Sequence, residues 1–452
     1  MKRRSFLSVL GSAPLGASLG GAGLLGTLSL PGSAAAADYR ALVVVFLAGG
    51  NDGHNTLVPT DGAYLDYQRA RPDLALAKAS LVDLPGSSAG HSFGLHASLA
   101  PLSGLYQQQR LAFMANVGPL VVPATAQQVK DHAVELPPFL MSHSDQQQYT
   151  QGWMGDTDAS GWAGRGLETL PASLKNALAA VTFDTNRTLV LGQNSRVAFL
   201  TPDGGRYWGN ADLAHPEGFW SQSLNRMAQW QFSNEYEAEY ARTFGGSITE
   251  STLFTQAFLK ATPPQATFED NELGRRLRTL ATVLPVLKNS GYKRQVFFVN
   301  WGSFDTHVNQ RGSGESTQDT QLMQLAKALT AFDTANQAAG LNRDVTTLVM
   351  SEFGRTLRPA SGGGSDHAWG NHWMAMGGAV SGGQVLGQFP SLVLGGVDDS
   401  DPNRGGRFVP TTSADQVGAS VMQWLGLPSA SVPDVFPNLK NFSQKSLALL
   451  SA

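Results

Sequence analysis

Acidic and histidine side chains gather in a few loops of this chain, and their types are those that bind metal ions. The predicted ligands are Asp52, Asp305, His307, Asp366, His367 and His372. Asp and His without Cys are typical ligands of Zn, Mn or Fe, whereas Mg or Ca is favoured where carboxylates dominate. The chain contains no Cys. We therefore predict a site for one or two divalent metal ions.

The spacing of two Asp–His pairs supports this prediction. Asp305 and His307 are two residues apart, so in an extended segment both side chains point to the same side. Asp366 and His367 are adjacent and point in different directions, which suits ligands shared between two ions. A single Asp–His pair is commonly only a hydrogen-bonded pair. Two such pairs, together with Asp52 and His372, all after apparent strands, favour a metal site.

Short apolar runs alternate with helical patterns along the chain. The runs are bounded by Gly, Asn or Pro and lie at 41–47, 111–117, 188–191, 296–299, 346–350 and 392–394. Runs this short, apolar on both faces, are typical of strands in a sheet covered on both sides. Helical patterns separate them, at 97–109, 220–243, 273–289, 317–339 and 413–425. The alternation predicts an α/β fold with a mostly parallel central sheet flanked by helices.

The predicted ligands follow three of these runs. Asp52 follows the first run, Asp305 and His307 follow the run at 296–299, and the remaining ligands follow the run at 346–350. Proteins with an open parallel sheet bind small molecules and ions beyond the carboxyl ends of the strands. We therefore expect these side chains to meet at that edge of the sheet. The stretch at 207–288 is helical in pattern without a buried-strand run. We predict that it is a helical insertion or cap within one domain at 38–452.

Composition excludes several classes of protein. With 452 residues, 42% of them hydrophobic, the chain can form a large core, which excludes a disordered chain. The net charge is −3, and no run of Lys or Arg occurs beyond the extreme N-terminus, so we expect no nucleic-acid partner. No later stretch approaches the length and apolarity of a membrane span.

The first 37 residues are typical of a twin-arginine export signal. Arg3 and Arg4 precede a weakly apolar stretch, and the small residues at 34–37 provide an A-x-A cleavage site. A membrane anchor is the alternative, although glycines dilute its apolar character. Cleavage removes three positive charges and no negative one, which changes the net charge from −3 to −6. We expect a periplasmic or secreted protein, exported by the twin-arginine translocase and without a stable membrane span after cleavage.

Several segments of the chain resemble a known bacterial family. They are LAGGNDGHNTLVP at 47–59, SHSDQQQ at 142–148, GWAGR at 161–165, FDTH at 304–307, SEFGRT at 351–356, GGSDHAWGNH at 363–372, PTTSADQ at 410–416 and VFPNLKNF at 435–442. The chain is identified as a member of a twin-arginine-exported family, domain of unknown function 1501, which resembles the alkaline phosphatase and sulfatase superfamily. The resemblance implies an alkaline phosphatase-like sheet and a two-metal site. Such a site hydrolyses phosphate or sulfate esters with a Ser or Thr nucleophile.

The resemblance also implies roles for individual residues. Asp52 would be the ligand after the first strand, the two Asp–His pairs would divide between the ions, and His372 would complete the set. Ser142 is the candidate nucleophile, because it precedes a helical-looking stretch whose dipole, with a metal ion, would favour its alkoxide. A plain N-cap serine is the alternative. Arg355, with Asn51, could hold an anionic group near the metal, or Arg355 could pair with Glu352.

The chain departs from the superfamily in two spacings. The distance in sequence from Asp305 to His307 is shorter than usual. His372 lies five residues after His367, whereas the last superfamily ligand is normally far downstream. A single ion, or a site that only binds, is therefore an alternative to two ions.

A competing motif is centred on Ser92. Residues 90–94 read G-x-S-x-G, the pattern of a nucleophile elbow, which needs a buried strand before it and a helix after it. The preceding residues are turn-like, and such a match arises easily in a chain rich in Gly and Ser. Ser92 is therefore the nucleophile of a third hypothesis only.

Together these observations predict an exported metal-dependent hydrolase of phosphate or sulfate esters that uses a metal-activated serine. Its substrate would be a small-molecule or glycan ester. The alternative is a non-catalytic exported binding or assembly protein that retains the fold, and the third hypothesis is a metal-free serine hydrolase. Five tryptophans near the proposed loops could line a substrate cleft, although packing is the commoner role: Trp153, Trp162, Trp301, Trp369 and Trp373.

Overall fold

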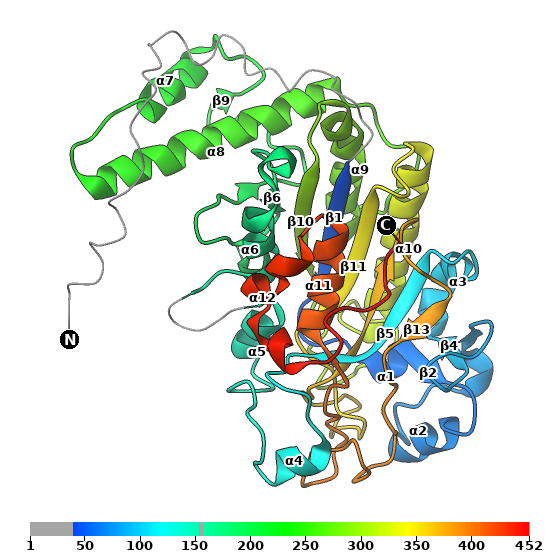
Figure 1. Ribbon diagram of the computed structural model, residues 1–452. Coiled ribbons are helices and arrows are strands. Elements are labelled where there is room, and N and C mark those ends of the chain that lie inside the picture. Colours follow the sequence, from blue (N-terminus) through cyan, green and yellow to red (C-terminus); the bar gives the residue numbers. More distant parts are fainter. Residues whose placement is uncertain (1–38, 153–157, 186, 452) are drawn as a thin grey trace.

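The computed structural model describes residues 39–152, 158–185 and 187–451. The predicted export signal at 1–37 and Trp153 lie outside these residues. A central sheet has helices on both of its faces (Figure 1). The predicted α/β class with a mostly parallel central sheet is confirmed.

Four neighbouring strands at the centre of the sheet position the site. In spatial order they are β12 (Asn371–Met376), β11 (Val345–Ser351), β1 (Arg40–Leu47) and β10 (Arg294–Trp301). β11, β1 and β10 are parallel, whereas β12 is antiparallel to β11. The outer strands are β5 (Leu111–Gly118), β13 (Gln384–Leu386), β14 (Thr412–Ser413), β6 (Ala180–Thr182) and β7 (Ala198–Phe199). The start of β12 therefore lies at the same edge as the carboxyl ends of its parallel neighbours.

The side chains of β1 illustrate why the apolar runs form buried strands. Leu42, Val44 and Phe46 pack into the core on one face of the sheet, and Val43 and Val45 pack into the core on the other face. All five are fully buried. Such burial on alternate sides requires a strand covered on both faces, where β-branched residues pack well.

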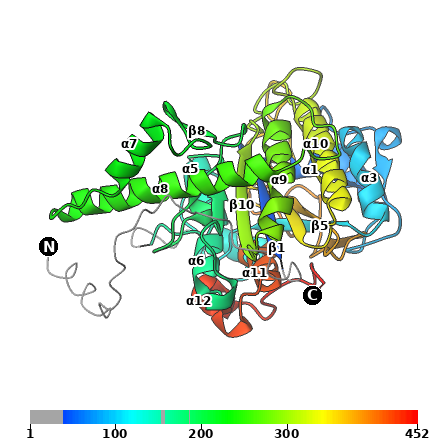
Figure 2. The ribbon, with the colours of Figure 1, turned by 90° about the horizontal axis from the view of Figure 1, so that it is seen from above.

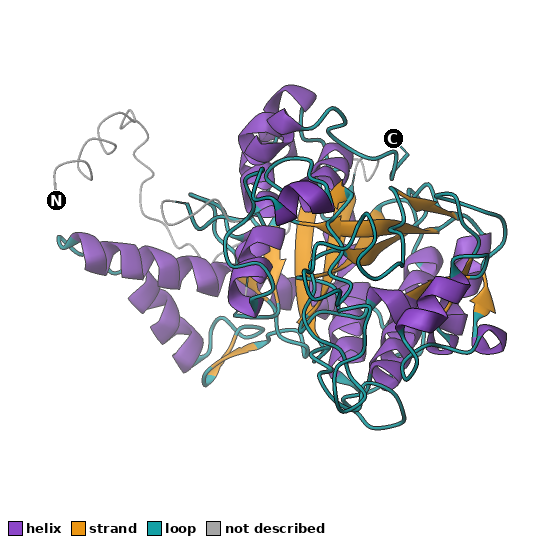
Figure 3. Cartoon of the chain, turned by 90° about the horizontal axis from the view of Figure 1, so that it is seen from below, coloured by secondary structure: helices purple, strands orange, loops and turns teal. Residues whose placement is uncertain are grey.

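Helices supply the two covering layers (Figure 3). The core on the face of Val43 includes α3 (Ala100–Gln107), α9 (Glu272–Asn289) and α10 (Gln318–Ala338). The core on the face of Leu42 includes α6 (Trp162–Thr169), α11 (Ala414–Trp424) and α12 (Val432–Val435). Other short helices and strands are α1 (Gly53–Thr56), α2 (Tyr64–Ala70), α4 (Ala126–Lys130), α5 (His143–Thr150), β2 (Leu57–Pro59), β3 (Val82–Asp83) and β4 (Phe93–Leu95).

The apolar runs at 41–47, 111–117, 296–299 and 346–350 are strands as predicted, but two of the predicted strands are wrong. The run at 188–191 contains the 3₁₀ helix η5 (Thr188–Val190), and the run at 392–394 lies outside every strand. Leu189 and Leu392 are nevertheless buried. A short apolar run indicates that its residues are buried. Burial alone does not distinguish a strand from a buried turn.

The stretch at 207–288 divides into two parts. β8 (Tyr207–Trp208), β9 (Ala211–Asp212), α7 (Phe219–Ala228) and α8 (Glu235–Lys260) come first, and α7 and much of α8 project away from the sheet (Figure 2). α9, in contrast, belongs to the layer over the sheet. Within the described ranges, no helix combines the length and apolar character needed to cross a membrane.

Candidate metal centre

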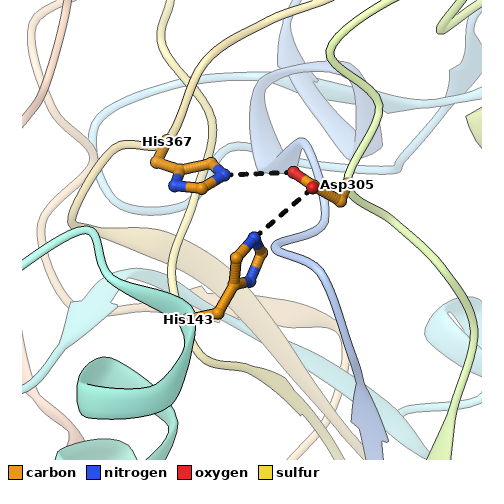
Figure 4. Close-up of side chains that lie close together, drawn as sticks. All are labelled: His143, Asp305 and His367. Atoms are coloured by element: carbon orange, nitrogen blue, oxygen red, sulfur yellow. Dashed lines mark hydrogen bonds and ion pairs between the residues drawn. The ribbon is translucent and has the colours of Figure 1, made fainter.

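Three side chains from distant parts of the chain meet at the carboxyl edge of the sheet (Figure 4). His143 is the first residue of α5, Asp305 follows β10, and His367 lies in the connection from β11 to β12. One possible ligand atom from each lies within 4.8 Å of the other two, and the three form a candidate metal-binding group. We call these residues the metal triad.

The carboxylate of Asp305 is the centre of the metal triad. Its Oδ1 lies 3.1 Å from Nε2 of His367, and its Oδ2 lies 3.4 Å from Nε2 of His143. His307 approaches the same carboxylate, with Nε2 2.9 Å from Oδ1 of Asp305. The Nε2 atoms of His307 and His367 are 3.0 Å apart. Three imidazole nitrogens therefore converge on one carboxylate.

The other ring nitrogen of each histidine has an acceptor outside this group. Nδ1 of His143 lies 3.1 Å from Oε1 of Glu352. Nδ1 of His307 lies 3.2 Å from Oδ1 of Asp366, and Nδ1 of His367 lies 2.8 Å from the carbonyl oxygen of Met141. A neutral imidazole that donates Nδ1–H outward has its Nε2 lone pair directed inward, which is the tautomer of a metal ligand.

These distances fit a shared cation. Ligand bonds of about 2.0–2.1 Å in a tetrahedral site place neighbouring donor atoms about 3.3 Å apart. The observed separations of 2.9–3.4 Å lie close to this value. Two inward lone pairs on His307 and His367 would repel each other at 3.0 Å unless a cation or a proton lay between them. The side chains of Asp305 and His307 are 39% and 42% exposed, so solvent reaches the group.

Arg355 forms an ion pair with Asp305. Its fully buried guanidinium donates from Nη1 to Oδ1 of Asp305 at 2.9 Å and from Nη2 to the carbonyl oxygen of Ser365 at 2.6 Å. Burial alone would raise the pKa of Asp305, but the ion pair with the buried Arg355 and the contact with His367 outweigh burial and lower it. Asp305 is therefore a carboxylate at neutral pH. The alternative partner considered for Arg355, Glu352, instead accepts from His143 and from the amide of Gly49 at 2.7 Å.

The two histidines of the metal triad share an aromatic neighbour, but their pKa values shift in opposite directions. The ring of Phe353 lies against both imidazoles, with centroids 4.9 Å from His143 and 4.6 Å from His367. The hydrogen bond to Glu352 raises the pKa of His143, whereas burial lowers the pKa of His367. Because metal ions bind the neutral imidazole, protons compete with a metal more strongly at His143 than at His367.

Glycine allows the loops of the site to approach one another. Gly49 has φ +105°, and a Cβ atom there would lie 2.4 Å from the backbone nitrogen of Asp305. A Cβ atom on Gly364 would lie 2.1 Å from the carbonyl carbon of His307. Both distances are shorter than any normal contact. The glycines in LAGGND and GGSDH are therefore needed to bring the ligand-bearing loops together.

The comparison with known families agrees with the resemblance read from the sequence. A family model described as "Protein of unknown function (DUF1501)" matches residues 39–402. The chain belongs to this family. No curated protein matches it in sequence.

Solved structures are only distantly similar to this DUF1501 chain. The lipoteichoic acid synthase LtaP from Listeria monocytogenes is 9% identical with a TM-score of 0.33, covering 87% of this chain and 74% of that one. The phosphonate monoester hydrolase SpPMH from Silicibacter pomeroyi has the same identity and coverage, with a TM-score of 0.31. A Bacteroides thetaiotaomicron protein of glycosaminoglycan metabolism is 12% identical, with a TM-score of 0.32 and coverage of 88% and 77%. Because these TM-scores are low, no function is inferred from these structures.

The structure places Asp52 outside the metal triad. In this DUF1501 chain, Oδ2 of Asp52 is bound by the guanidinium of Arg71 and by Nε2 of Gln310 at 2.6 Å, and Oδ1 accepts from the amide of His54 at 3.0 Å. The side chains of Asp52 and Arg71 are fully buried. Both carboxylate oxygens thus form contacts within the protein, and we leave Asp52 out of the ligand set proposed below.

His372 is also outside the metal triad. It lies on β12, where Nδ1 accepts from the amide of Asn116 at 3.1 Å and the ring stacks on Phe389 with centroids 4.9 Å apart. Burial, with a smaller contribution from His54, lowers the pKa of His372 to about 3. Asp366 contacts the group only through Nδ1 of His307. Of the six predicted ligands, Asp305, His307 and His367 come together.

His143 and Glu352 are the residues that sequence reasoning missed. Both lie within segments that resemble the family, SHSDQQQ and SEFGRT. His143 begins a helix and follows no strand, so the rule that polar residues follow strands could not find it. Its neighbour Ser142 is the N-cap residue of α5, and its hydroxyl donates to Oδ2 of Asp145 at 2.5 Å.

The remaining sequence candidates have structural roles. Ser92 leads into β4, a strand of the small antiparallel sheet with β2 and β3, so the strand–turn–helix geometry of a nucleophile elbow does not occur at these described residues. Of the five candidate tryptophans, the four within the described part of the chain are buried and contribute to the cores: Trp162, Trp301, Trp369 and Trp373.

Proposed function

We propose that this protein is a metal-dependent hydrolase of phosphate or sulfate esters, with a divalent ion held by His143, Asp305 and His367, and by His307 from the solvent side. One observation carries the proposal: three imidazole Nε2 atoms converge on the Asp305 carboxylate while each Nδ1 atom faces an outer acceptor. Zn or Mn suits this set of nitrogen and oxygen donors best.

The proposal specifies one ion. The sequence assigned six ligands to two ions, but Asp52 and His372 are engaged elsewhere in the protein. Asp305 and the three histidines around it make four groups, which match the ligand number of a single ion, and His307 would give up its place to substrate or water. When bound, the ion would polarise an ester oxygen and lower the pKa of a coordinated water.

The protein's own groups would act as follows. Glu352, Asp366 and the carbonyl of Met141 orient the imidazoles, and Arg355 keeps Asp305 ionised. Ser142 Oγ would form a bond to phosphorus or sulfur while the bond from that atom to the leaving oxygen breaks, and the serine proton would pass to Asp145. Water would then displace Ser142 and release inorganic phosphate or sulfate.

The proposed setting follows the sequence prediction. The substrate would be a small-molecule or glycan ester in the periplasm or outside the cell, reached through the twin-arginine translocase. Asp305, His307 and Asp366 are substantially exposed, which supports access of a soluble ester to the site.

Metal analysis of matched variants tests the proposal. Purified chain, folded with Zn, Mn or Mg available, is expected to hold about one equivalent of metal and to hydrolyse p-nitrophenyl phosphate or p-nitrophenyl sulfate. Asp305→Asn is expected to lose both properties. His91→Ala is the matched control, because His91 and Asp61 form a partly exposed pair 2.9 Å apart outside the site.

The outcomes separate the alternatives. A well-folded wild type without metal under any condition would contradict the proposal. One bound ion without turnover of any ester would favour a non-catalytic binding or assembly protein. Hydrolysis that persists in chelator and disappears in Ser92→Ala would favour a metal-free serine hydrolase.

A further inference from the structure

A cavity at the amino ends of two neighbouring strands is separate from the metal triad. It has a volume of about 660 Å³ and lies where β6 and β10 begin, since Ala180 and Arg294 line it. The metal triad, in contrast, lies at the carboxyl edge of the sheet. α6 and α8 contribute Leu167 and Leu253 to the wall of the cavity. Cavities of about 300–1,000 Å³ with mainly apolar walls are typical sites for small molecules.

The apolar part of this wall is aliphatic. Its larger side chains are those of Leu167, Leu170, Leu174 and Leu253, and its smaller ones are alanines. No aromatic side chain occurs among the described residues that line the cavity. Nucleobases and other flat ligands commonly stack on aromatic side chains, so this wall does not suit them. Leucine and alanine instead provide apolar surface against which a flexible aliphatic chain can be buried.

One carboxylate oxygen in the wall has no hydrogen-bond donor. Oε1 of Glu250 accepts from Nε of Arg196 at 2.9 Å, and none of the described residues donates to its Oε2. The side chain of Glu250 is only 10% exposed. Burial raises the pKa of Glu250, and the opposing effect of Arg196 is smaller. Because a buried carboxylate is stabilised by hydrogen bonds to both oxygens, an O–H or N–H group of a ligand would complete this one.

Other contacts hold Arg196 in place, so it does not supply the second hydrogen bond to Glu250. Its Nη2 donates to the carbonyl oxygen of Thr243 at 2.6 Å, and its Nη1 donates to the carbonyl oxygen of Arg242 at 3.1 Å. Gly246 leaves room for this arrangement, because a Cβ atom there would lie 2.2 Å from Cζ of Arg196. The guanidinium is thus fixed against α8, and Oε2 of Glu250 remains available to a ligand.

The charges of the wall favour an anionic group elsewhere on the ligand. The charged residues that line the cavity are three basic and two acidic ones: Lys175, Arg196, Arg294, Glu168 and Glu250. Both oxygens of Glu168 accept from backbone amides of residues 193–195. Lys175 is exposed, so it lies at the opening, and its ammonium group forms no ion pair with the described residues. The excess of positive charge disfavours a cationic ligand and favours a carboxylate beside Lys175.

We propose that this cavity binds an aliphatic hydroxy acid, with its chain against the leucines, its hydroxyl group donating to Oε2 of Glu250 and its carboxylate beside Lys175. Calorimetric titration of the purified chain with three compounds of matched length tests this inference. The compounds are 10-hydroxydecanoate, decanoate, which lacks the hydroxyl group, and 10-amino-1-decanol, which carries a cation in place of the carboxylate. We expect 10-hydroxydecanoate to bind at least about tenfold more tightly than either of the others.

Two variants test the polar contacts separately. In Glu250→Gln the amide oxygen still accepts from Arg196 and the NH₂ group faces the ligand, so 10-hydroxydecanoate is expected to bind no more tightly than decanoate. Lys175→Met is expected to weaken the binding of both carboxylates by about threefold or more. Lys440→Met is the matched control, because Lys440 is exposed and lies outside the cavity. Circular dichroism verifies that each variant is folded.

Three results would overturn the inference. The first is a wild type that binds none of the three compounds at 1 mM. The second is equal affinity of the wild type for decanoate and 10-hydroxydecanoate, or a preference for the hydroxyl group that Glu250→Gln retains. The third is a loss of affinity in Asp305→Asn, which would place the carboxylates at the metal triad. None of the compounds is a phosphate or sulfate ester, so the test does not depend on hydrolysis.

Discussion

The carboxylate of Glu352 lies 3.1 Å from Nδ1 of His143, although the two residues are 209 positions apart in the chain. Glu352 is fully buried and also accepts the amide of Gly49, so its position is fixed. Through this contact a residue at the end of β11 determines which nitrogen of a helix-terminal histidine faces Asp305. The hydrogen bond thus connects the sheet to the metal triad.

Replacing Glu352 by Gln is expected to weaken metal binding. The amide can still accept from Gly49, but it can no longer provide a charged acceptor for Nδ1–H of His143. Loss of such an outer partner typically lowers metal affinity 10–100-fold. Competition with a chromogenic chelator measures the affinity. Glu250→Gln, a carboxylate paired with Arg196 elsewhere, is the control, and equal affinities for both variants would refute the role of Glu352.

Replacing Arg355 by Met is expected to affect both stability and metal binding. The variant leaves Oδ1 of Asp305 and the carbonyl oxygen of Ser365 without a buried donor. Loss of hydrogen bonds to a charged group of this kind costs about 2–3 kcal/mol of the free energy of unfolding. Urea denaturation in chelator measures this cost. An unchanged denaturation midpoint would show that solvent replaces both bonds.

Replacing Gly49 by Ala is expected to disturb the site directly. The new Cβ atom would lie 2.4 Å from the nitrogen of Asp305, and Ala is strained at φ +105°. We expect a loss of about 2 kcal/mol in unfolding free energy and weaker metal binding. In contrast, Gly62→Ala introduces a Cβ atom with nothing within 4 Å and should change stability by less than about 0.5 kcal/mol. Similar effects of the two substitutions would contradict this explanation.

Replacing Ser142 by Ala separates metal binding from turnover. Ser142 precedes the proposed ligand His143 and donates a hydrogen bond to Asp145, and its own side chain is not among the proposed ligands. We expect full metal content and at least a hundredfold loss of ester hydrolysis. Retained hydrolysis would indicate direct attack by water, and the role of the Ser142 hydroxyl would then be limited to its hydrogen bond to Asp145.

A pH-dependent contribution to stability is expected from Asp319, at the start of α10. Burial raises its pKa, but hydrogen bonds from His96 and Arg311 outweigh burial and lower it from 3.8 to about 2. The unfolded chain therefore binds this proton more readily, and stability falls as the pH decreases from about 4 to 2. Asp319→Asn should be less stable than wild type by about 1–2 kcal/mol at pH 6, and the difference should vanish near pH 2. Thermal unfolding of both proteins across this range measures it, with the exposed Asp66→Asn as control.

Much of the fold could be predicted because its strands and helices follow from the spacing of apolar residues within short segments of the sequence. The strands β1, β10 and β11 are apolar on both faces, and α9, α10 and α11 have clear helical patterns. The loops after β10 and β11 were expected to bring Asp305, His307 and His367 to one edge of the sheet, and these side chains do lie together there. These predictions needed only the rule that parallel strands end at a common edge.

The rest of the site depends on contacts that a linear pattern does not contain. Asp52 follows β1, the position at which a metal ligand was expected. Its buried carboxylate is instead bound by Arg71 and Gln310. His143 follows no strand and reaches the site because α5 lies beside the edge of the sheet. The spacing of residues in the sequence does not show whether Asp52 binds a metal or a neighbouring side chain. It also does not show where α5 packs.

The antiparallel direction of β12 has a consequence for how this architecture can vary. The connection between Ser351 and Asn371 leaves the sheet and returns at the same rim, and it carries Glu352, Arg355 and His367 on the way. The proposed ligand His367 and the residues that support the site, Glu352 and Arg355, therefore belong to one continuous segment of the chain. In the proposed hydrolase, insertions at the exposed residues 361–362 would change access to the site while the pairing of the strands keeps its register. Substrate preference would then change without any change to the sheet.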